Sequence, residues 1–506
     1  MAKRENDLGR DPVGKLLLRL AIPTVTAQLV NALYNIVDRF YIGHIPEVGD
    51  LALTGLGVCF PVILFVSAIS ALVGMGGSSR AVVHMGEGKM ELANSILGSC
   101  TTLLVVLGAA AMAAFLVFQE PMLYLFGATE ETIGYAMDYL TIYLYGSIFV
   151  EISLGLNYFI TAQGFSTMGM ATVLIGAVIN IVLDPVFIFG FGMGVKGAAL
   201  ATITAQGVSA VWVVWFLLGK RTRLRLQRQY LRPSWRVLAP VLALGVSPFI
   251  MQSTESLINI AFNSSLKAYG GNPAVGAMTI CSSIMQVFSL LSQGLSQGAQ
   301  PIIGFNYGSG QLERVKKTFR LLFITSVIYS CATFAALQLF PGLFVSLFND
   351  KPELVEIAVW ALHIYAAGIF MLGVQFSCQQ TFVALCQTRI SLFNDKPELV
   401  EISVWALHVY AAGLFMLGVQ FSCQQAFVAL GQTRISLFLA LLRKVILLIP
   451  LIFLLPQFFA DKVLGVFLAE PVADVLASAT TGALFFWRFP KILEHRRQEL
   501  AQINPQ

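Results

Sequence analysis

Six acidic residues lie within long apolar stretches of the chain, where charged side chains are least expected. An ionised carboxylate at the centre of a bilayer costs at least about 2.5 kcal/mol, so such residues mark proton or ion sites by default. Asp184 is the most informative, because Asn180 lies four residues earlier on the same helical face and Pro185 follows directly. The six residues are Asp38, Glu151, Asp184, Glu255, Glu470 and Asp474.

Pro185 is expected to bend the helix that carries Asp184. Proline lacks a backbone N–H and clashes with the carbonyl group four residues earlier, here that of Ile181. A bent helix with a free carbonyl, a carboxylate and a carboxamide is a plausible oxygen-rich site for a proton or Na⁺. The structural alternative is that Asp184 pairs with a donor on a neighbouring helix.

Structural explanations also exist for other members of the acidic set. Asp38 stands next to Arg39, and the two could form an ion pair at a helix end, with Arg39 reaching for the membrane interface. Glu470 and Asp474 flank Pro471, where helix packing and function are equally good explanations.

Enzyme chemistry finds little support in the residue pattern. The chain shows no cluster of metal ligands, no Gly-rich nucleotide-binding loop and no nucleophile with a partnered base. We therefore expect a protein that is not an enzyme, that has no cofactor, and that is driven by a gradient of H⁺ or Na⁺ rather than by ATP. No metal site is expected beyond Na⁺ at the coupling site.

The elements that must position the acidic residues are membrane helices. Of the 506 residues, 57% are hydrophobic and 12% are charged, about half the charged share of a soluble protein. A helix needs about 20 apolar residues to cross a bilayer. Runs of that length predict helices near 15–41, 51–83, 93–118, 132–162, 168–190, 196–219, 238–266, 273–305, 317–341, 355–386, 400–430, 435–456 and 463–487.

Basic residues gather in the connections that follow the even-numbered helices, above all in 220–236. This cluster suggests nucleic-acid binding, but membrane spans flank it, and the positive-inside rule explains it better as a cytoplasmic loop. Acidic residues such as Glu47, Asp50 and Asp138 occupy the odd-numbered connections. Both termini are thus expected in the cytoplasm of a multi-pass inner-membrane (cytoplasmic-membrane) protein with an even number of spans.

Weak internal matches indicate an ancient repeat. A Gly-rich polar stretch at 74–79 has a counterpart at 293–300, and the turn at 86–89 has one at 306–310. Six spans return the chain to its starting side, so two such units are related by an axis along the membrane normal. We predict an all-α membrane protein with an N-terminal six-helix lobe (1–219), a basic cytoplasmic linker (220–236) and a C-terminal lobe (237–506).

A second repeat is recent. Residues 346–390 and 391–435 form two 45-residue segments that differ at five positions. Each copy holds one span, so insertion of both copies into the membrane would give thirteen spans. The basic C-terminal tail would then lie on the external side, against the positive-inside rule. A genuine duplication of the gene segment and an error in joining two related sequences during assembly would produce the same repeat. We hypothesise that one copy is surplus and favour the second as the native tenth helix, because it runs directly into the next one.

Several motifs closely resemble the multidrug and toxic compound extrusion (MATE) family. They are Ala21-Ile22-Pro23, the run from Tyr34 to Gly43, the run from Asn180 to Ile188, the run from Gly194 to Thr202, the run from Gln300 to Gly308, and Pro471-Val472-Ala473-Asp474. The resemblance covers nearly the whole chain except one 45-residue copy. It implies twelve helices in two six-helix lobes.

The resemblance also implies a function and a site. Such transporters export bulky cationic or aromatic drugs in exchange for H⁺ or Na⁺ by alternating access. The N-lobe coupling site then consists of Asp38, Asn180, Asp184 and Thr202, and Tyr34, Gln252 and Glu255 are candidates for the substrate cavity. Another branch pairs the counterpart of Glu255 with an aspartate inside the tenth helix, and neither 45-residue copy has an aspartate inside that helix, so the chain departs from the pattern of a C-lobe ion site.

Two other functions remain open from the sequence. A flippase for lipid-linked sugars shares the fold, but it predicts a basic cavity, whereas the membrane charges here are acidic. A receptor that binds a ligand without moving it is disfavoured by the lack of a soluble signalling domain. The expected partners are drugs or toxic organic cations and the lipid bilayer, with no nucleic acid, and we expect a monomer.

Overall fold

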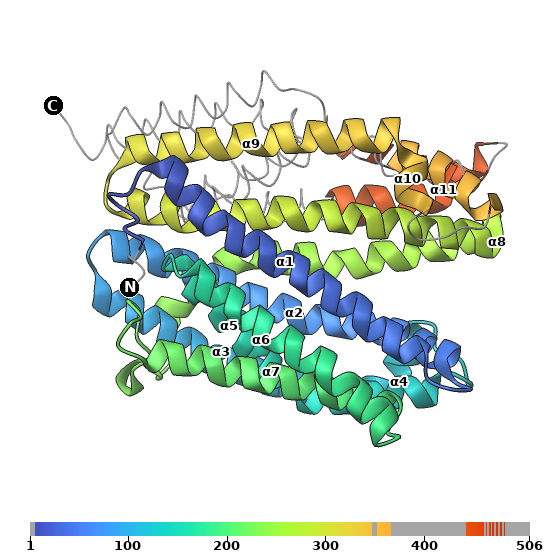
Figure 1. Ribbon diagram of the computed structural model, residues 1–506, viewed down its shortest axis with the longest axis horizontal. Helices are drawn as coiled ribbons and strands as arrows, with labels where there is room; N and C mark the ends of the chain where they lie inside the picture. Colours follow the sequence, from blue (N-terminus) through green and yellow to red (C-terminus); the bar gives the residue numbers. More distant parts are fainter. Residues whose placement is uncertain are drawn as a thin grey trace. The chain divides into compact units, whose positions relative to one another are not determined.

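The computed structural model describes residues 6–346, 352–365 and 442–459, together with scattered positions in 462–480 (Figure 1). The regular elements of this part of the chain are all helices. They form two compact units, of which the first takes in the described residues up to Ile260 and those of Gln286–Thr325. The second takes in Ala261–Met285 and the described residues from Ser326 onward.

Seven α-helices build most of the first unit: α1 (Val13–Gly43), α2 (Gly49–Gly86), α3 (Met90–Leu125), α4 (Ile133–Tyr145), α5 (Ser147–Ala162), α6 (Ser166–Pro185) and α7 (Val195–Leu218). The single helix expected at 132–162 is wrong, because α4 and α5 meet at an angle of 56°. Gly146 lies at this bend, and a Cβ there would be 2.3 Å from Cγ2 of Ile203. A side chain is thus excluded where α7 packs against the bend.

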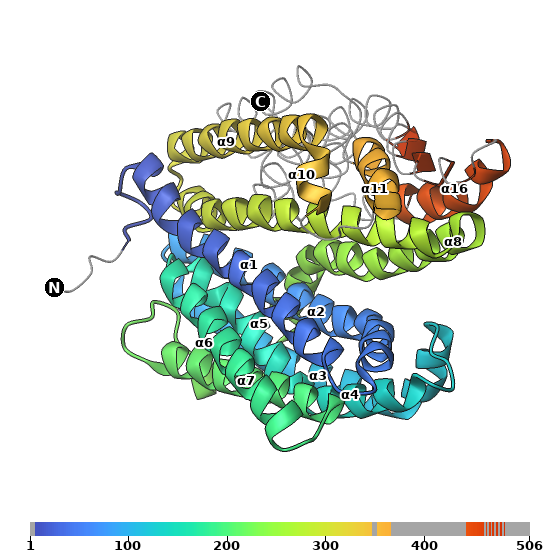
Figure 2. The same ribbon diagram turned by 45° about the vertical axis from the view of Figure 1, so that its right-hand side comes forward.

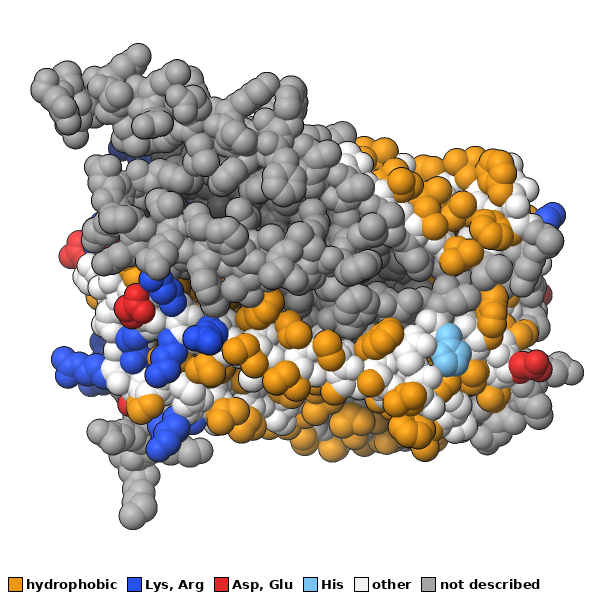
Figure 3. Space-filling model, turned by 90° about the horizontal axis from the view of Figure 1, so that it is seen from above, with side chains coloured by type: hydrophobic (Ala, Val, Ile, Leu, Met, Phe, Trp, Pro, Cys, Tyr) orange, Lys and Arg blue, Asp and Glu red, His pale blue; other side chains and the backbone are white. Residues whose placement is uncertain are grey.

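The length and composition of these helices suit a membrane. Among the described residues, α1, α2, α3, α7, α9 (Leu312–Leu339) and α6 with its π-helical extension are each long and apolar enough to cross a bilayer. The bent pair α4 and α5 makes a seventh span if counted as one. In Figure 3, hydrophobic side chains cover the middle of the visible described surface, and Lys and Arg gather toward one end.

Helix α8 (Trp235–Gly308) runs unbroken through the region where two helices, 238–266 and 273–305, were expected. Its ribbon nevertheless doubles back (Figures 1 and 2). Gly76 and Gly86, about three turns apart on α2, approach Val241 and Phe305 respectively, so the two ends of α8 lie near each other. The expected break between 266 and 273 is thus absent, and the change of direction occurs within helical backbone.

Glycines set how closely α2 packs on α8. A Cβ on Gly86 would lie 2.1 Å from the Phe305 carbonyl oxygen, and a Cβ on Gly308 would lie 2.0 Å from the Val83 carbonyl oxygen. The contact is reciprocal, as expected where two related segments meet across a two-fold axis. It joins the two turns that the internal sequence repeat aligned.

Gly76→Ala tests this packing. Its Cβ would lie 2.3 Å from the Val241 carbonyl oxygen, and overpacking of this kind typically costs about 1–3 kcal/mol. We expect a lower midpoint of thermal unfolding in detergent. The matched control is Gly57→Ala on the same helix, where nothing lies within 4 Å of the new Cβ. Equal midpoints for the two variants would contradict the close contact.

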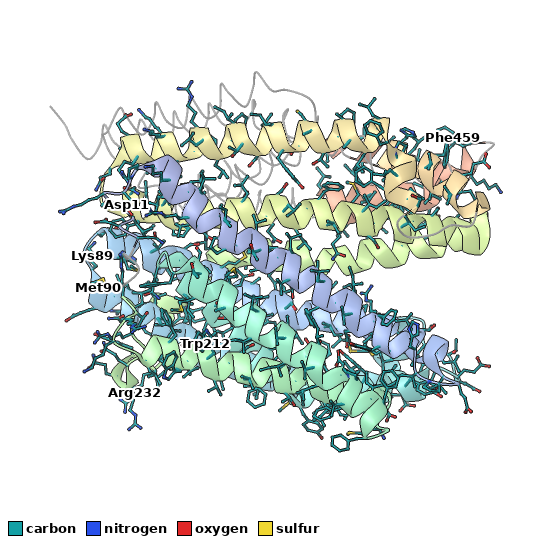
Figure 4. The ribbon with its side chains drawn as sticks, in the orientation of Figure 1. Asp11, Lys89, Met90, Trp212, Arg232 and Phe459 are labelled. Carbon is teal, nitrogen blue, oxygen red and sulfur yellow. The ribbon has the colours of Figure 1, made fainter. Side chains whose placement is uncertain are left out.

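The basic end of the first unit carries the start of α1, the turn between α2 and α3, and the linker after α7. Asp11, Lys89, Met90 and Arg232 mark this end in Figure 4. Hydrogen bonds tie its segments together. The Arg314 guanidinium donates to the carbonyl oxygens of Leu8 (3.0 Å) and Asp11 (2.8 Å), and the Arg225 backbone N–H donates to Asn94 Oδ1 (2.9 Å).

The second unit contains α10 (Pro341–Ser346), α11 (Pro352–Tyr365), a π-helix (Leu442–Leu448), α16 (Ile449–Leu454) and a 3₁₀ turn (Leu455–Gln457). Gln338 of α9 holds α11 by donating to the carbonyl oxygen of His363 at 3.0 Å. Helix α11 belongs to the first 45-residue copy. The second copy lies outside the described residues, so the choice of the native tenth helix stays a prediction, as does the division into lobes.

Candidate functional site

Three helices bring the four predicted coupling residues together. Asp38 lies near the end of α1, Asn180 and Asp184 lie in the last turns of α6, and Thr202 lies in the second turn of α7. All four are buried, with exposed fractions of 7% or less. Helix α1 packs along α6, and α6 packs along α7. These contacts gather residues from three helices into one site.

Asn180 links the members of the site. Its Nδ2 donates to Asp184 Oδ1 at 3.2 Å and to Thr202 Oγ1 at 3.4 Å. The predicted common face of Asn180 and Asp184 is thereby confirmed, and the hydrogen-bond donor to Asp184 comes from its own helix rather than from a neighbour. The α-helix ends at Pro185, and a π-helix continues it (Val186–Gly190). The helix geometry therefore changes at the predicted proline.

The alternative explanation of Asp38 as half of an ion pair with Arg39 is wrong. The Arg39 guanidinium instead lies over the ring of Phe60, 5.4 Å from its centroid. Among the described residues, no ion pair involves Asp38 or Asp184. The two carboxyl groups lie within electrostatic range of each other, and the Tyr34 hydroxyl lies within range of both.

Three oxygens of the site have no hydrogen-bond partner within the described part of the chain. They are Asp38 Oδ1, Asn180 Oδ1 and Asp184 Oδ2, and all are buried. Two neighbouring carboxylates cannot both stay ionised in a buried site without compensation. Protons on the acids would supply it, and so would a small cation bound by these oxygens. The donor set therefore fits both H⁺ and Na⁺.

A cavity of about 40 Å³, lined by both polar and apolar side chains, opens beside the site. Water needs roughly 10–15 Å³ of such space, so the cavity has room for water or an ion but is far below the roughly 300 Å³ or more of a drug pocket. Its polar lining includes Asn31, Tyr34, Asn157, Asn180, Thr202 and Gln206. Tyr34 lines this small cavity, and its predicted place in a substrate cavity stays a prediction.

Sequence reasoning missed Asn31, Asn157 and Gln206 of this cavity. Asn31 shares a face of α1 with the predicted Tyr34 and Asp38 by spacings of three and four residues, a signal that was present in the sequence. Asn157 and Gln206 come from α5 and α7, and no local pattern connects them. Ser153 on α5 donates to Gln206 Oε1, which fixes this polar pair.

The described part of the structure does not place the other predicted residues at this site. Glu255 and Gln252 belong to α8, but their side chains lie outside the described atoms. Glu470 and Asp474 also lie outside the described residues. Glu151 is described and lies in a separate place, against α2 and α3.

Comparisons with known proteins agree with this architecture. The family model MatE matches residues 23–186 and 248–393. The multidrug export protein MepA of Staphylococcus haemolyticus is 24% identical over 362 residues, 72% of this chain and 79% of that protein. MepA of Staphylococcus aureus (strain NCTC 8325) is 23% identical over 372 residues, 72% of this chain and 80% of that protein.

Solved structures show the same fold. The MATE multidrug transporter DinF-BH, solved in complex with a small molecule, is 32% identical with a TM-score of 0.78, covering 96% of this chain and 98% of that one. An outward-facing MATE transporter of the MOP superfamily is 20% identical with the same TM-score, covering 97% of this chain and 99% of that one. These likenesses confirm the expected all-α membrane fold of two six-helix lobes.

The matched family model covers more than half of the chain, and the relative at 32% identity matches nearly its whole length. The match ends at 393, so it includes the first 45-residue copy and only the start of the second. Apolar spans, a buried acidic site and these matches lead to one family. The chain is a multi-pass membrane protein that belongs to the MATE family, whose members are transporters and not enzymes.

Proposed function

We propose that this protein exports bulky cationic or aromatic compounds in exchange for H⁺ or Na⁺, by alternating access. The main support is the buried cluster of Asp38, Asn180, Asp184 and Thr202. Three oxygens of this cluster lack hydrogen-bond partners in the described chain, and neither acid forms an ion pair with a described basic residue. Buried acids that form no direct ion pair gain most from binding a proton or a cation. The names of the MepA relatives as multidrug export proteins support the same function.

The coupling follows from the charge of the site. When H⁺ or Na⁺ binds, the net negative charge of the acids falls, and with it their attraction for a cationic drug. Helix α1 carries Asp38 and also contains Pro23, a position without a backbone N–H where a helix bends easily. Neutralising Asp38 and Asp184 lets α1 bend and releases the drug. Loss of the ion to the low-concentration side restores the charged, drug-binding state.

The acidic character of the site favours drug export over flipping of lipid-linked sugars. A pyrophosphate group requires Lys or Arg, whereas the buried charged residues of the described site are Asp38 and Asp184. The complex of DinF-BH shows that a relative at 32% identity binds a small molecule, as a drug exporter must. The proposed cargo is therefore drugs or toxic organic cations.

We further propose that the protein works as a monomer in the inner (cytoplasmic) membrane, with the basic end on the cytoplasmic side. Arg232 of the linker and Lys89 of the turn lie at this end (Figure 4), and Arg225 is tied to Asn94 there, as the positive-inside rule requires. Labelling of single cysteines placed in 220–236 with a membrane-impermeant reagent tests the orientation. Labelling from the outside of intact cells would contradict it.

Reconstitution into liposomes tests the function. The full chain is expected to move a cationic dye against its gradient when a pH gradient or a Na⁺ gradient is imposed, but not when both gradients are absent. Comparing the two gradients identifies the coupling ion. If neither gradient drives dye transport while a lipid-linked sugar is flipped, drug export is the wrong function.

A further inference from the structure

Glu151 is a fully buried acid that the proposed coupling site does not use. It lies on α5, the helix whose Ser153 and Asn157 line the cavity beside the coupling site. Glu151 points away from that cavity, toward α2 and α3, because its contacts are Ser70 of α2 and Gly108 of α3. Helix α5 therefore carries polar groups on two different faces, and only one of them belongs to the cavity.

The surroundings of Glu151 are built to receive a carboxyl group. Ser70 Oγ donates to Glu151 Oε2 at 2.8 Å. A Cβ on Gly108 would lie 3.1 Å from Glu151 Cγ, so the glycine makes room for the side chain. The other oxygen, Oε1, is buried and has no partner in the described part of the chain. That leaves one carboxyl oxygen with unused hydrogen-bonding capacity.

Within the described chain, no positive charge compensates Glu151. Helices α2 and α3 present Ser70 and Gly108 to it, and α4 presents Tyr143, a titratable group that is neutral at physiological pH. None of the ion pairs between described residues includes Glu151. A carboxylate that is fully buried and unpaired is strongly disfavoured relative to the neutral acid. In this conformation the group therefore carries a proton.

The helix contacts around Glu151 control access to it. One turn further along α5, Gly155 touches α2, because a Cβ on Gly74 would lie 2.7 Å from the Gly155 carbonyl oxygen. At the other side of Glu151, α5 begins at the 56° bend with α4. Separation of α2 from α5 would expose the carboxyl group to water, and the bend at the start of α5 lies about one turn from Glu151.

We propose that Glu151 is a second proton-binding site of this protein, closed by the packing of α2 against α5 and separate from the site of Asp38 and Asp184. It rests on the proposed ion-coupled export, which it extends. Glu151 keeps its proton while α2 and α5 are packed and exchanges it when they part during the cycle. If Na⁺ is the ion at the first site, Glu151 still makes the transporter sensitive to pH.

Infrared difference spectroscopy of the full chain in liposomes, recorded across a rise in pH, tests this proposal. The wild type is expected to lose a protonated-carboxyl band that is missing in Glu151→Gln. Gln keeps the shape of the side chain and its hydrogen-bonding capacity, so folding should be retained. In Ser70→Ala the same band should remain but shift in frequency, because the acid loses its hydrogen bond. Ser70→Ala also serves as the second variant if Glu151→Gln misfolds.

The matched control is Glu87→Gln, which alters a partly exposed carboxylate that accepts from Lys89 and His84 at the basic end. Its spectrum in the carboxyl region should equal that of the wild type. A Glu151→Gln spectrum that equals the wild type would overturn the proposal, and so would an unchanged band in Ser70→Ala. Asp184→Asn should remove a different carboxyl band. The spectra therefore distinguish an error in the proposed coupling site from an error in the proposed Glu151 site.

Discussion

An Asp184→Asn variant is expected to lose gradient-driven export while folding as the wild type does. Asparagine preserves the size of the side chain and can still hydrogen-bond to Asn180, which donates to Asp184 at 3.2 Å. It cannot bind a proton or offer a charge to Na⁺. Coupling free energies between two ligands are about 1–3 kcal/mol, so the effect of the ion on dye affinity should be lost, a change of roughly 5–150-fold, and driven export should fall with it. Dye uptake in liposomes measures the loss.

Asp138→Asn is the matched control for this change. Asp138 is also an aspartate of the first unit, but its side chain is 45% exposed and pairs with Lys196 at 3.3 Å at the surface. Exposed pairs contribute little, so export and thermal stability should stay at wild-type levels. Full export by Asp184→Asn under either gradient would remove Asp184 from the coupling mechanism.

Deleting one 45-residue copy is expected to give a working transporter with an even number of spans. A chain lacking 346–390 and a chain lacking 391–435 differ only at the five positions where the copies differ, such as Cys386 and Gly431. Both shortened chains should place the basic tail on the same side as the linker 220–236. We therefore expect them to export dye at least as fast as the full chain and to resemble each other.

Cysteine labelling and dye export on the three chains check this prediction. A single cysteine in the tail should report the cytoplasmic side in both shortened chains. If the full chain transports and neither shortened chain does, the extra segment is a required part of the protein rather than a surplus copy. If both copies of the full chain label as spans in the same direction within the bundle, the surplus hypothesis is wrong.

Local spacing was enough to predict the centre of the site. Asn180 and Asp184 are four residues apart, and Pro185 marks where the α-helix ends, so this part of the site follows from one helix alone. The link to Asp38 and Thr202 came from a family resemblance, because it depends on how three helices pack. The apolar runs likewise gave the spans but not the bend at Gly146, which depends on contact with α7.

Contacts between distant segments explain what the sequence did not reveal. The i, i+1 pair Asp38–Arg39 suggested an ion pair, but Phe60 of α2 offers Arg39 a ring face that only the folded structure brings near. Asn157 and Gln206 are ordinary polar residues in sequence and become cavity residues through packing. The separation of Glu151 from the coupling site could not be seen either, because it depends on which helices pack against each face of α5.

The exchange of drug for ion is tested most directly by running it in reverse. Liposomes that contain the full chain are loaded with a cationic dye, and internal pH and internal Na⁺ are followed as the dye leaves down its gradient. We expect H⁺ or Na⁺ to move in the opposite direction although no gradient of either ion is imposed. Asp184→Asn should abolish this counterflow. Dye efflux at the wild-type rate with neither ion moving would contradict antiport through the site of Asp38, Asn180, Asp184 and Thr202.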